Sequence, residues 1–598
     1  MKYIQTSGLI FFLAGFAIFL GTFFVGSYQL SENQLSNILS QNEIDRLKIP
    51  LNEALNQSFS SNFQLIATLD RAFASANQQV FNEYGFTSSD LETITEAMGT
   101  FPAQFSLSKA SATFSSGSEF AMSKKKALMD YGSWLEGREY QSKEALHSEL
   151  EGVVNNYHQY GLIGQQGFDK YRIKNLKYEL TRSASQGAVT DHPGLFILLT
   201  YVLCLVGAAM FILPKVSIDG PPGIKNHGIQ FSSMKTRGWL GIITGTFLII
   251  FYVLLYFYPE YMTNWIIMVD PVSFFLKGSP AGRFFLYGFI YTLTILVMGV
   301  RMLINYRHSK YQMIRTASVM FFQTALAFLI PEILLRLNKP YFDFKNIWPL
   351  DYDFFFDNEL NTLIDSGTLG IFMLGWGIAL ILLGVPIMVY FFGKRWYCSW
   401  VCGCGGLAET LGDPYRQLSD KSLKAWKIER WMVHGVLAFA VIMTAGVLYT
   451  YWTGSSQFLG LNTYNVRSVY GAWIGAGFAG VVGTGFYPLM GNRVWCRFGC
   501  PLAAYLGLVQ RFKSRFRITT NGGQCISCGN CSTYCEMGID VRWYAQRGQN
   551  IIRSSCVGCG ICSAVCPRGV LNLENASEST RMKAPILIGN DSFEVQKP

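Results

Sequence analysis

Two cysteine runs decide the most distinctive part of this chain: CISCGNCSTYC at residues 525–535 and CVGCGICSAVCP at residues 556–567. Each run has the spacing C-x2-C-x2-C-x3-C, and the second one ends in Cys-Pro. Three thiolates separated by two residues wrap a tight loop around one face of a cubane, and the fourth reaches a neighbouring cluster. The spacing therefore predicts two [4Fe–4S] clusters in a compact α+β module of the bacterial ferredoxin kind.

This crossed arrangement assigns the ligands of each cluster. One cluster is predicted to be held by Cys525, Cys528, Cys531 and Cys566, and its neighbour by Cys556, Cys559, Cys562 and Cys535. Gly529, Gly558 and Gly560 let the backbone turn closely around the clusters. Structural zinc is the alternative, because C-x2-C is also zinc spacing. The first run departs from the usual pattern at Glu536, where a proline ordinarily follows the last cysteine.

A second cysteine group lies upstream, in WYCSWVCGC at residues 396–404 and WCRFGCP at residues 495–501. The x3 spacing predicts that both thiols of each pair share one helical face, so thiolates converge from two helix ends. Soft thiolates suit a third cluster, copper(I) or zinc, whereas simple apolar packing is the alternative. The candidate ligands are Cys398, Cys402, Cys404, Cys496 and Cys500. Cys204, which stands alone, is expected only to pack.

The rest of the chain has the composition of a polytopic α-helical membrane bundle. Half of its 598 residues are hydrophobic and 15% are charged, well under the roughly 25% charged residues of soluble proteins. A signal peptide is the alternative for the first apolar run, but its leader has only Lys2, it lacks a clear A-x-A site and it is long enough to span, so we expect an uncleaved anchor. Eight runs are long enough to cross ~30 Å of hydrocarbon: 8–27, 194–213, 239–258, 283–300, 317–335, 370–392, 432–451 and 471–490.

Charges in the loops predict the orientation. Segments 214–237, 301–315 and 393–430 are basic, whereas segment 337–366 is acidic. All three basic loops fall on one side if both termini are cytoplasmic, as the positive-inside rule requires. The net charge of +10 thus comes from loop asymmetry, which argues against nucleic acid as a partner. We expect a multi-pass protein of the bacterial inner membrane.

Residues 28–193 are then expected on the periplasmic side. They are polar, more acidic than basic, and free of cysteine, whereas all but one of the 14 cysteines follow residue 397. Cysteines outside a disulfide framework are expected on the reducing, cytosolic side. The predicted organisation is an anchor at 1–27, an exported helical or α+β domain at 28–193, a seven-helix bundle at 194–517, a 2[4Fe–4S] module at 518–575 and a polar tail at 576–598.

At these residues the chain resembles membrane-bound polyferredoxins of the NosR/NirI, NapH and CcoG type. In that family paired C-x3-C-P motifs follow transmembrane helices and precede a C-terminal double [4Fe–4S] domain. The layout is most similar to NosR-like members. Cys500-Pro501 fits the motif, but Cys402 is followed by Gly403 and a further cysteine, Cys404. The specific motifs cover about residues 393–570.

The resemblance also raises the question of whether FMN is attached to the exported domain. NosR-like exported domains attach FMN through a Ser or Thr in an S/T-G-A-T-x-S/T motif. The nearest stretch here is ASATFS at residues 110–115, which lacks the glycine. If FMN is attached, Ser115 is the candidate residue, but an ordinary Ser-rich loop is the preferred interpretation.

Two functional hypotheses follow. In the first, the chain is an electron-transfer component that passes electrons between a cytosolic donor or the quinone pool and a redox partner in the membrane or periplasm. In the second, which the CcoG-like resemblance implies, the clusters reduce copper for delivery to a respiratory oxidase or reductase. A redox sensor or scaffold without turnover is a third class. No catalytic residue is assigned, and an oxidoreductase component is favoured over an independent catalyst.

Overall fold

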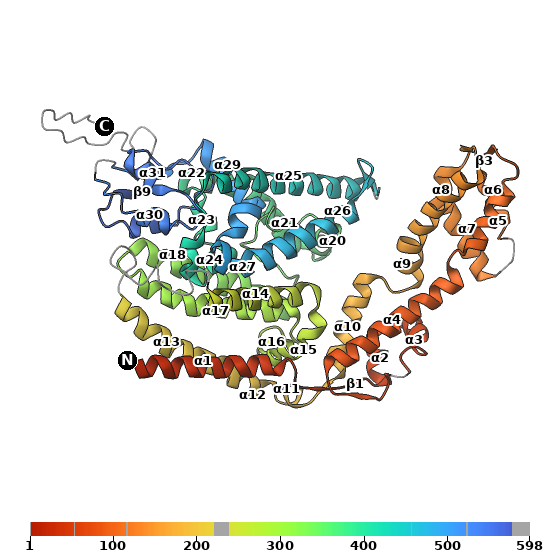
Figure 1. Cartoon of the computed structure of the whole chain (residues 1–598), viewed down its shortest axis with the longest axis horizontal. Helices are drawn as coiled ribbons and strands as arrows, with labels where there is room; N and C mark the ends of the chain where they lie inside the picture. Colours follow the sequence, from red (N-terminus) through yellow and green to blue (C-terminus); the bar gives the residue numbers. More distant parts are fainter. Residues whose placement is uncertain are drawn as a thin grey trace. The chain divides into compact units, whose positions relative to one another are not determined.

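The computed structural model describes residues 2–52, 54–114, 118–219, 238–455, 457–521 and 524–576. The chain divides into two compact units, which Figure 1 colours along the sequence. Unit 1 comprises residues 1–19, 193–257 and 268–598, and unit 2 comprises residues 20–192 and 258–267. Ser115, loop residues 220–237 and tail residues 577–598 lie outside the described residues.

Unit 2 is mostly helical. Its strands are very short and antiparallel: β2–β1–β5 form one sheet and β3–β4 another. Serine, threonine and aspartate side chains cap several helices, as Ser61 caps α4 and Asp169 caps α10, which accounts for part of the polar composition. The elements are β1 Ser27–Gln29, α2 Glu32–Ile38, α3 Gln41–Leu47, β2 Ser58–Phe59, α4 Asn62–Tyr84, α5 Ser88–Ala97, β3 Ala103–Gln104, α6 Leu107–Ala112, α7 Glu119–Gly132, η1 Ser133–Leu135, β4 Glu139–Tyr140, α8 Lys143–Asn156, η2 Tyr157–Leu162, α9 Ile163–Gln166, α10 Lys170–Ala184, β5 Ser185–Gln186, α11 Ala188–Asp191, η5 Pro259–Met262 and α15 Thr263–Met268.

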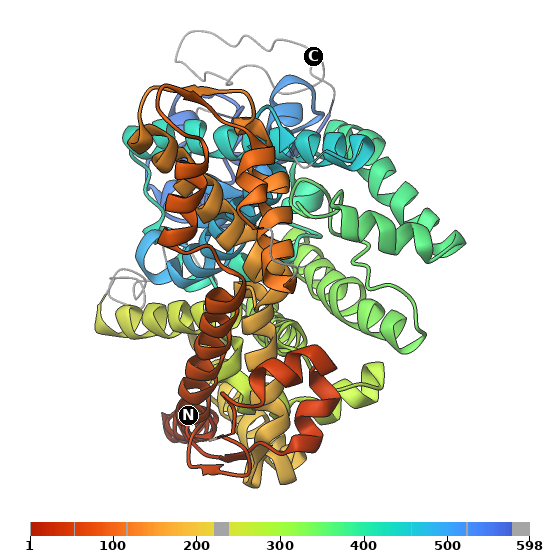
Figure 2. The ribbon, with the colours of Figure 1, turned by 90° about the vertical axis from the view of Figure 1, so that its right-hand side faces the viewer.

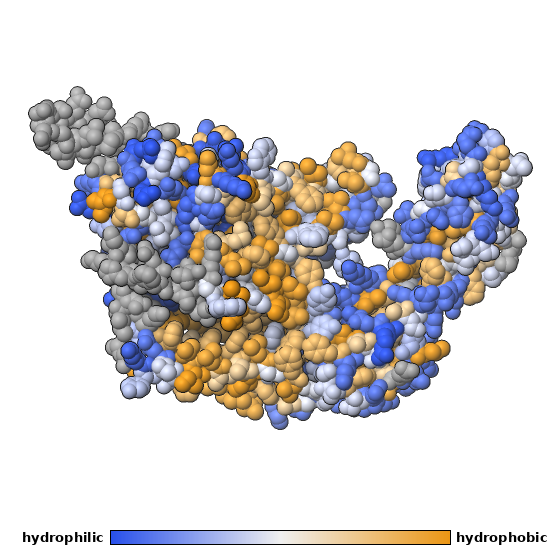
Figure 3. Space-filling model, viewed as in Figure 1, coloured by the Kyte–Doolittle hydropathy of each residue, from blue (hydrophilic) through white to orange (hydrophobic). Residues whose placement is uncertain are grey.

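Apolar helices dominate unit 1, and their surface is mainly hydrophobic in Figure 3. Among the described residues, six helices are long and apolar enough to cross a membrane, or seven if the bent pair at 241–268 counts as one span. They are α1 Lys2–Thr22; α12 Pro193–Ile197 with η3 Leu198–Val202 and α13 Leu203–Asp219; α17 Arg283–Asn305; α18 Lys310–Phe321 with η6 Phe322–Leu329 and α19 Ile330–Arg336; α21 Thr368–Ala379 with η7 Leu380–Gly384 and α22 Val385–Phe392; and α25 Leu423–Thr453. α14 Trp239–Phe257 belongs to the bent pair.

The span expected at 471–490 is not among these helices. The chain there runs through α26 Thr463–Tyr470, η9 Gly471–Val482 and α27 Gly483–Gly485, then starts a separate helix, α28 Tyr487–Met490. Pro488 lies in the first turn of α28, where proline is tolerated at a helix start but not inside one. The glycines of this stretch also add little hydropathy, so the eight-span count exceeds the count in the structure.

The acidic segment between α19 and α21 packs into the bundle. Phe342, Ile347 and Phe354 belong to the same buried core as Cys398 and Cys402. The sequence alone predicts only an acidic loop here. Its aromatic residues explain the difference, because they bury apolar surface while the acidic side chains between them remain partly exposed.

The last part of unit 1 is the cysteine-rich module. β8 Phe516–Thr520 pairs antiparallel with β9 Leu571–Asn575, and the two cysteine runs lie between these strands. Figure 2 shows the same ribbon turned by 90°. The remaining elements are α16 Asp270–Lys277, α20 Asp357–Asp365, α23 Arg395–Cys398, α24 Gly403–Thr410, η8 Asp413–Leu418, β6 Gln457–Phe458, β7 Leu461–Asn462, η10 Trp495–Gly499, α29 Pro501–Phe512, α30 Asn530–Thr533, α31 Val541–Gln546 and α32 Ile561–Ala564.

Candidate iron–sulfur and thiolate sites

The two cysteine runs have matching local structure. In each run the first two cysteines lie in a loop, the third lies in a one-turn helix (α30 or α32), and the fourth follows that helix. Gly529 and Gly560, which immediately precede these helices, have φ angles of 81° and 72°. A residue with a Cβ is strained in this left-handed region, so the glycines let each loop reverse before its helix, as the sequence predicts.

One cavity is lined by a cysteine set drawn from both runs. It has an empty volume of about 360 Å³, counting the part that is open to solvent, and Pro567 and Leu571 also line it. Four thiols facing one hollow, with apolar residues around them, fit the ligand chemistry of a [4Fe–4S] cluster. The four cysteines are Cys525, Cys528, Cys531 and Cys566.

The other predicted set also lies together. Burial raises the pKa of the Cys562 thiol, and the neighbouring thiols of Cys559, Cys535 and Cys556 raise it further. The backbone N–H of Ile539 lies 3.4 Å from Cys535 Sγ and donates to it. Such N–H donors favour the thiolate form, which is the ligand form. The donor set therefore fits a second cluster.

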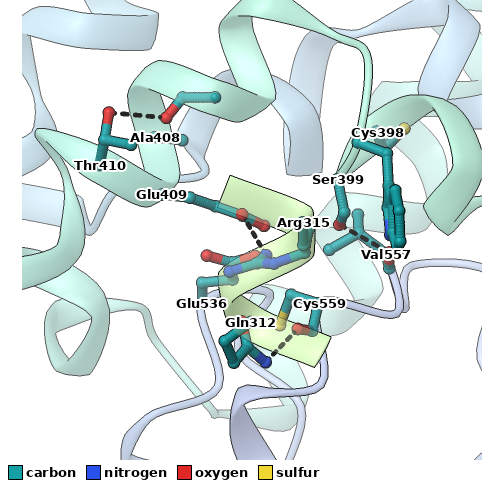
Figure 4. A network of polar contacts seen from close by, with 12 residues as sticks. Gln312, Arg315, Cys398, Ser399, Ala408, Glu409, Thr410, Glu536, Val557 and Cys559 are labelled. Atoms are coloured by element: carbon teal, nitrogen blue, oxygen red, sulfur yellow. Dashed lines mark hydrogen bonds and ion pairs between the residues drawn. The ribbon is translucent and has the colours of Figure 1, made fainter. Parts of the chain in front are cut away.

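Side chains of the bundle hold the loop at 556–559. Tyr311 Oη donates to the Gly558 carbonyl at 3.0 Å, and Gln312 Nε2 donates to the Cys559 carbonyl at 2.8 Å. Ser399 Oγ donates to the Val557 carbonyl at 2.9 Å (Figure 4). The module is therefore seated on α18 and on the segment after α23.

The five upstream cysteines line a second cavity, with an empty volume of about 270 Å³. Tyr397, Trp495 and Leu502 complete much of its wall. Hydrogen bonding with Cys404 lowers the pKa of Cys402 despite burial. The structure thus brings together every upstream candidate: Cys398, Cys402, Cys404, Cys496 and Cys500.

The thiols converge by a route that differs from the expected one. The x3 pairs do not share a helical face, because α23 ends at Cys398 and Cys402 precedes α24. Likewise Cys496 lies in η10, whereas Cys500 is the N-cap of α29. Pro501 disfavours helical backbone at Cys500, and Cys402 likewise has extended backbone at the N-cap of α24. Neither pair therefore lies on one continuous helix, and all four thiols line the cavity.

A buried ion network lies beside these cysteines and was not anticipated from the sequence (Figure 4). Glu536 Oε2 lies 2.5 Å from Arg416 Nη1, and its Oε1 lies 3.0 Å from Arg493 Nη2. Glu409 forms ion pairs with Arg315 and with Arg493. Burial alone would raise the pKa of Glu536, but Arg493, Arg416 and Arg315 lower it to about 2. The unusual residue after Cys535 is therefore an ionised anchor.

Arg493 extends this network to the upstream cysteines. Its Nη1 donates to the Cys398 carbonyl at 3.2 Å and lies 3.6 Å from Cys496 Sγ. Lys345, on the segment between α19 and α21, forms an ion pair with Asp343 at 3.2 Å and helps to lower the pKa of Cys402. The only sequence signal for these contacts was the departure from proline at Glu536.

Two other residues considered in the sequence, Cys204 and Ser115, are not part of these cysteine groups. Cys204 lies in α13, where its thiol is 3.7 Å from the Phe12 carbonyl and is remote from the other cysteines in sequence. Ser115, the FMN candidate, lies outside the described residues. Within residues 2–52, 54–114, 118–219, 238–455, 457–521 and 524–576, no group of three or more His, Cys, Asp or Glu side chains has the geometry of a metal-ion site.

Comparisons with known proteins agree with this chemistry. Residues 374–423 and 471–519 match a family described as a 4Fe-4S binding domain, and residues 496–571 match a 4Fe-4S dicluster domain. These two matches contain all the cysteines of both sites. No solved structure matches the chain significantly.

Three curated relatives match about a quarter of the chain. YccM of Escherichia coli, named as a candidate electron transport protein, is 28% identical over 27% of this chain and 47% of its own length. The methylamine utilization ferredoxin-type protein MauN of Paracoccus denitrificans is 30% identical over 27% of this chain and 56% of its own. The ferredoxin-type protein NapH of Haemophilus influenzae is 26% identical over 26% and 54%. The chain thus spans about half the length of these relatives. The cysteine-containing part of the chain is thus similar to 4Fe-4S binding and dicluster domains, and about a quarter of the chain is similar to NapH, MauN and YccM.

Proposed function

We propose that this chain is a membrane-bound iron–sulfur electron-transfer protein. It would pass electrons between a cytosolic donor or the quinone pool and a redox partner in the membrane or periplasm. The observation that carries this proposal is that unit 1 contains both four-cysteine groups and the five-cysteine cavity, with the loop at 556–559 hydrogen-bonded to Gln312 and Ser399. Electron transfer from a cytosolic module to a membrane site requires redox centres that lie close to one another.

The eight ferredoxin-type cysteines would hold two [4Fe–4S] clusters, which supply one-electron transfer when bound. The chain's own residues provide the thiolates, a backbone N–H donor to Cys535 and an apolar surround. Tyr311, Gln312 and Ser399 fix the loop that carries Cys559. The five-cysteine cavity is a candidate for a third centre.

We infer that the protein crosses the bacterial inner membrane several times, with both termini cytoplasmic. The basic loops 301–315 and 393–430 support this orientation, because positively charged loops stay on the cytoplasmic side. Residues 28–193 would then face the periplasm, where the mostly helical unit 2 could contact a partner. The cysteine module would face the reducing cytosol.

A tyrosine-rich cavity supports the quinone pool as the electron donor. It has an empty volume of about 480 Å³ and shares Cys404, Cys496 and Trp495 with the wall of the five-cysteine cavity. The indole Nε1 of Trp495 and Oδ1 of Asn492 are buried and have no hydrogen-bond partner within the described part of the chain. An unpaired donor and acceptor match the oxygens of a quinone and quinol headgroup. The cavity is lined by Tyr252, Tyr256, Tyr287, Tyr291 and Tyr487.

Filling this cavity should slow reduction by quinol. We expect Ala479→Phe, which adds a ring to the cavity wall, to lower the rate of cluster bleaching by a soluble quinol at least tenfold, about 1.4 kcal/mol. Reduction of the same variant by dithionite should be unchanged. Ala472→Phe is the matched control, because Ala472 lies on the same η9 segment but is exposed. Equal quinol rates in both variants would exclude this cavity as the donor site.

The decisive test of the proposed function is the metal content of the anaerobically purified full-length chain. Iron, sulfide, copper and flavin are measured per chain. We expect about eight iron atoms if only the module is loaded, and about twelve if the five-cysteine cavity holds a third cluster. Zinc in place of iron would overturn the proposal.

Copper reduction for a respiratory enzyme is the second candidate function. It is favoured by Cys404, an additional thiol that joins the C-x3-C pairs in one buried cavity, because soft thiolates select copper(I). Substitution of Cys398, Cys402, Cys496 and Cys500 separates the two functions. A maturation factor would leave its client depleted of metal, whereas an electron donor would leave a metallated client that is not reduced.

A further inference from the structure

The buried ion network carries an inference about the cluster beside it. Four guanidinium groups, those of Arg301, Arg315, Arg416 and Arg493, face three carboxylates, those of Glu409, Asp413 and Glu536. The network therefore holds one more positive than negative charge. Arg315, Arg416, Arg493 and Glu536 are almost completely buried, so water screens these charges weakly.

Arg315 has hydrogen-bonding capacity that its protein partners do not use. Its side chain is fully buried and forms an ion pair with Glu409, yet its Nε and Nη2 have no hydrogen-bond partner among the residues that the structure describes. An unsatisfied buried donor costs about 1–3 kcal/mol. Such a donor therefore indicates an acceptor that completes the site.

The position of Arg315 identifies that acceptor. Gln312, one helical turn earlier on α18, donates to the carbonyl of Cys559, and Figure 4 shows Arg315 between Glu409 and Glu536 on the side of Cys559. Glu536 directly follows Cys535 in the sequence. Arg315 and Glu536 both act electrostatically on the Cys559 thiol. Both residues thus adjoin ligands of the same predicted cluster, whose sulfur atoms are anionic acceptors.

We propose that Arg315 and Glu536 are positioning residues that set the reduction potential of the cluster held by Cys535, Cys556, Cys559 and Cys562. This inference rests on the proposed function, because it requires a cluster at those cysteines. Reduction adds one electron from the reductant and transfers no atom, so the site becomes one unit more negative. Buried positive charge stabilises that state, and buried negative charge opposes it.

The direction in which each substitution shifts the reduction potential tests the proposal. Glu536→Gln removes a negative charge and is expected to raise the reduction potential, whereas Arg315→Gln removes a positive charge and is expected to lower it. Each change should alter the equilibrium constant for reduction at least tenfold, which is about 59 mV for one electron. The measurement is a redox titration of the full-length chain in nanodiscs, followed by electron paramagnetic resonance, with iron counted in every sample.

Two control variants separate this effect from general destabilisation. Arg315→Lys keeps the charge and should remain within threefold of the wild-type equilibrium constant. Glu429→Gln alters another buried ion pair, which joins Glu429 to Arg497 at 2.7 Å, and should produce no shift. If Arg315→Gln loses its iron, Glu536→Gln still decides: no rise in potential overturns the inference.

Failure of the inference is distinguishable from failure of the proposed function. Normal iron content with shifts of one sign in both charge variants overturns the inference alone. A wild-type chain without iron overturns the proposed function, and the inference falls with it.

Discussion

Cys562→Ser is expected to remove one whole cluster, about four of about eight iron atoms, and to leave the other cluster in place. The crossed arrangement makes this expectation specific. Cys535→Ser, in the other run, should remove the same cluster as Cys562→Ser, whereas Cys566→Ser should remove the cluster whose ligands line the cavity with Cys525. Iron and sulfide analysis gives the loss, and the low-temperature paramagnetic resonance signal identifies the surviving cluster.

Cys204→Ser is the matched control, because this cysteine lies in α13 and is not among the residues that line either cysteine cavity. It should retain the full iron content. If Cys562→Ser and Cys566→Ser deleted the same signal, each run would hold its own metal, and the crossed ligand assignment would be wrong.

Arg416→Met is expected to destabilise the seating of the cysteine module by about 3–5 kcal/mol. Arg416 is buried against Glu536 at 2.5 Å and Asp413 at 2.8 Å. Its loss leaves Glu536 buried with only part of its compensating charge, and an uncompensated buried charge is costly. Hydrogen–deuterium exchange of the full-length chain should show faster exchange in β8 and β9, at least a hundredfold for about 3 kcal/mol.

The double variant Arg416→Met/Glu536→Met provides the contrast. It removes both partners and leaves Arg493 paired with Glu409 and Asp413 paired with Arg301. Replacing both members of a buried pair by apolar residues is often close to neutral. Exchange in the double variant should therefore return most of the way to the wild-type rate. Equal destabilisation in the single and double variants would show that packing, and not charge, holds the module.

The fold could be predicted where the local composition and residue spacing alone define an element. Long apolar runs define α1, α17 and α25 because a bilayer span needs about 20 apolar residues. The segment at 342–354 could not be placed, since its acidic residues mask the aromatic side chains that enter the core. The helix breaks near Pro488 and Pro501 also depend on the local backbone, which hydropathy does not report.

The candidate site could likewise be predicted only where short-range sequence patterns define it. The groups of cysteines that line each cavity follow from ferredoxin spacing and from the recurrence of C-x3-C, which are short-range patterns. The ion network joins residues from four distant segments, including Arg315, Glu409 and Glu536. A single sequence does not show which of these distant charged residues form ion pairs. Only Glu536, an acidic residue at a position where proline is usual, gave a signal.

The β8–β9 pairing has a consequence for biogenesis. β9 and Cys566 emerge from the ribosome after every apolar helix of unit 1 has been synthesised, and β9 closes the module by pairing with β8. Because domains fold as units during synthesis, the module remains open while the helices enter the membrane. Cluster loading at Cys566 would therefore follow the synthesis of all the apolar helices.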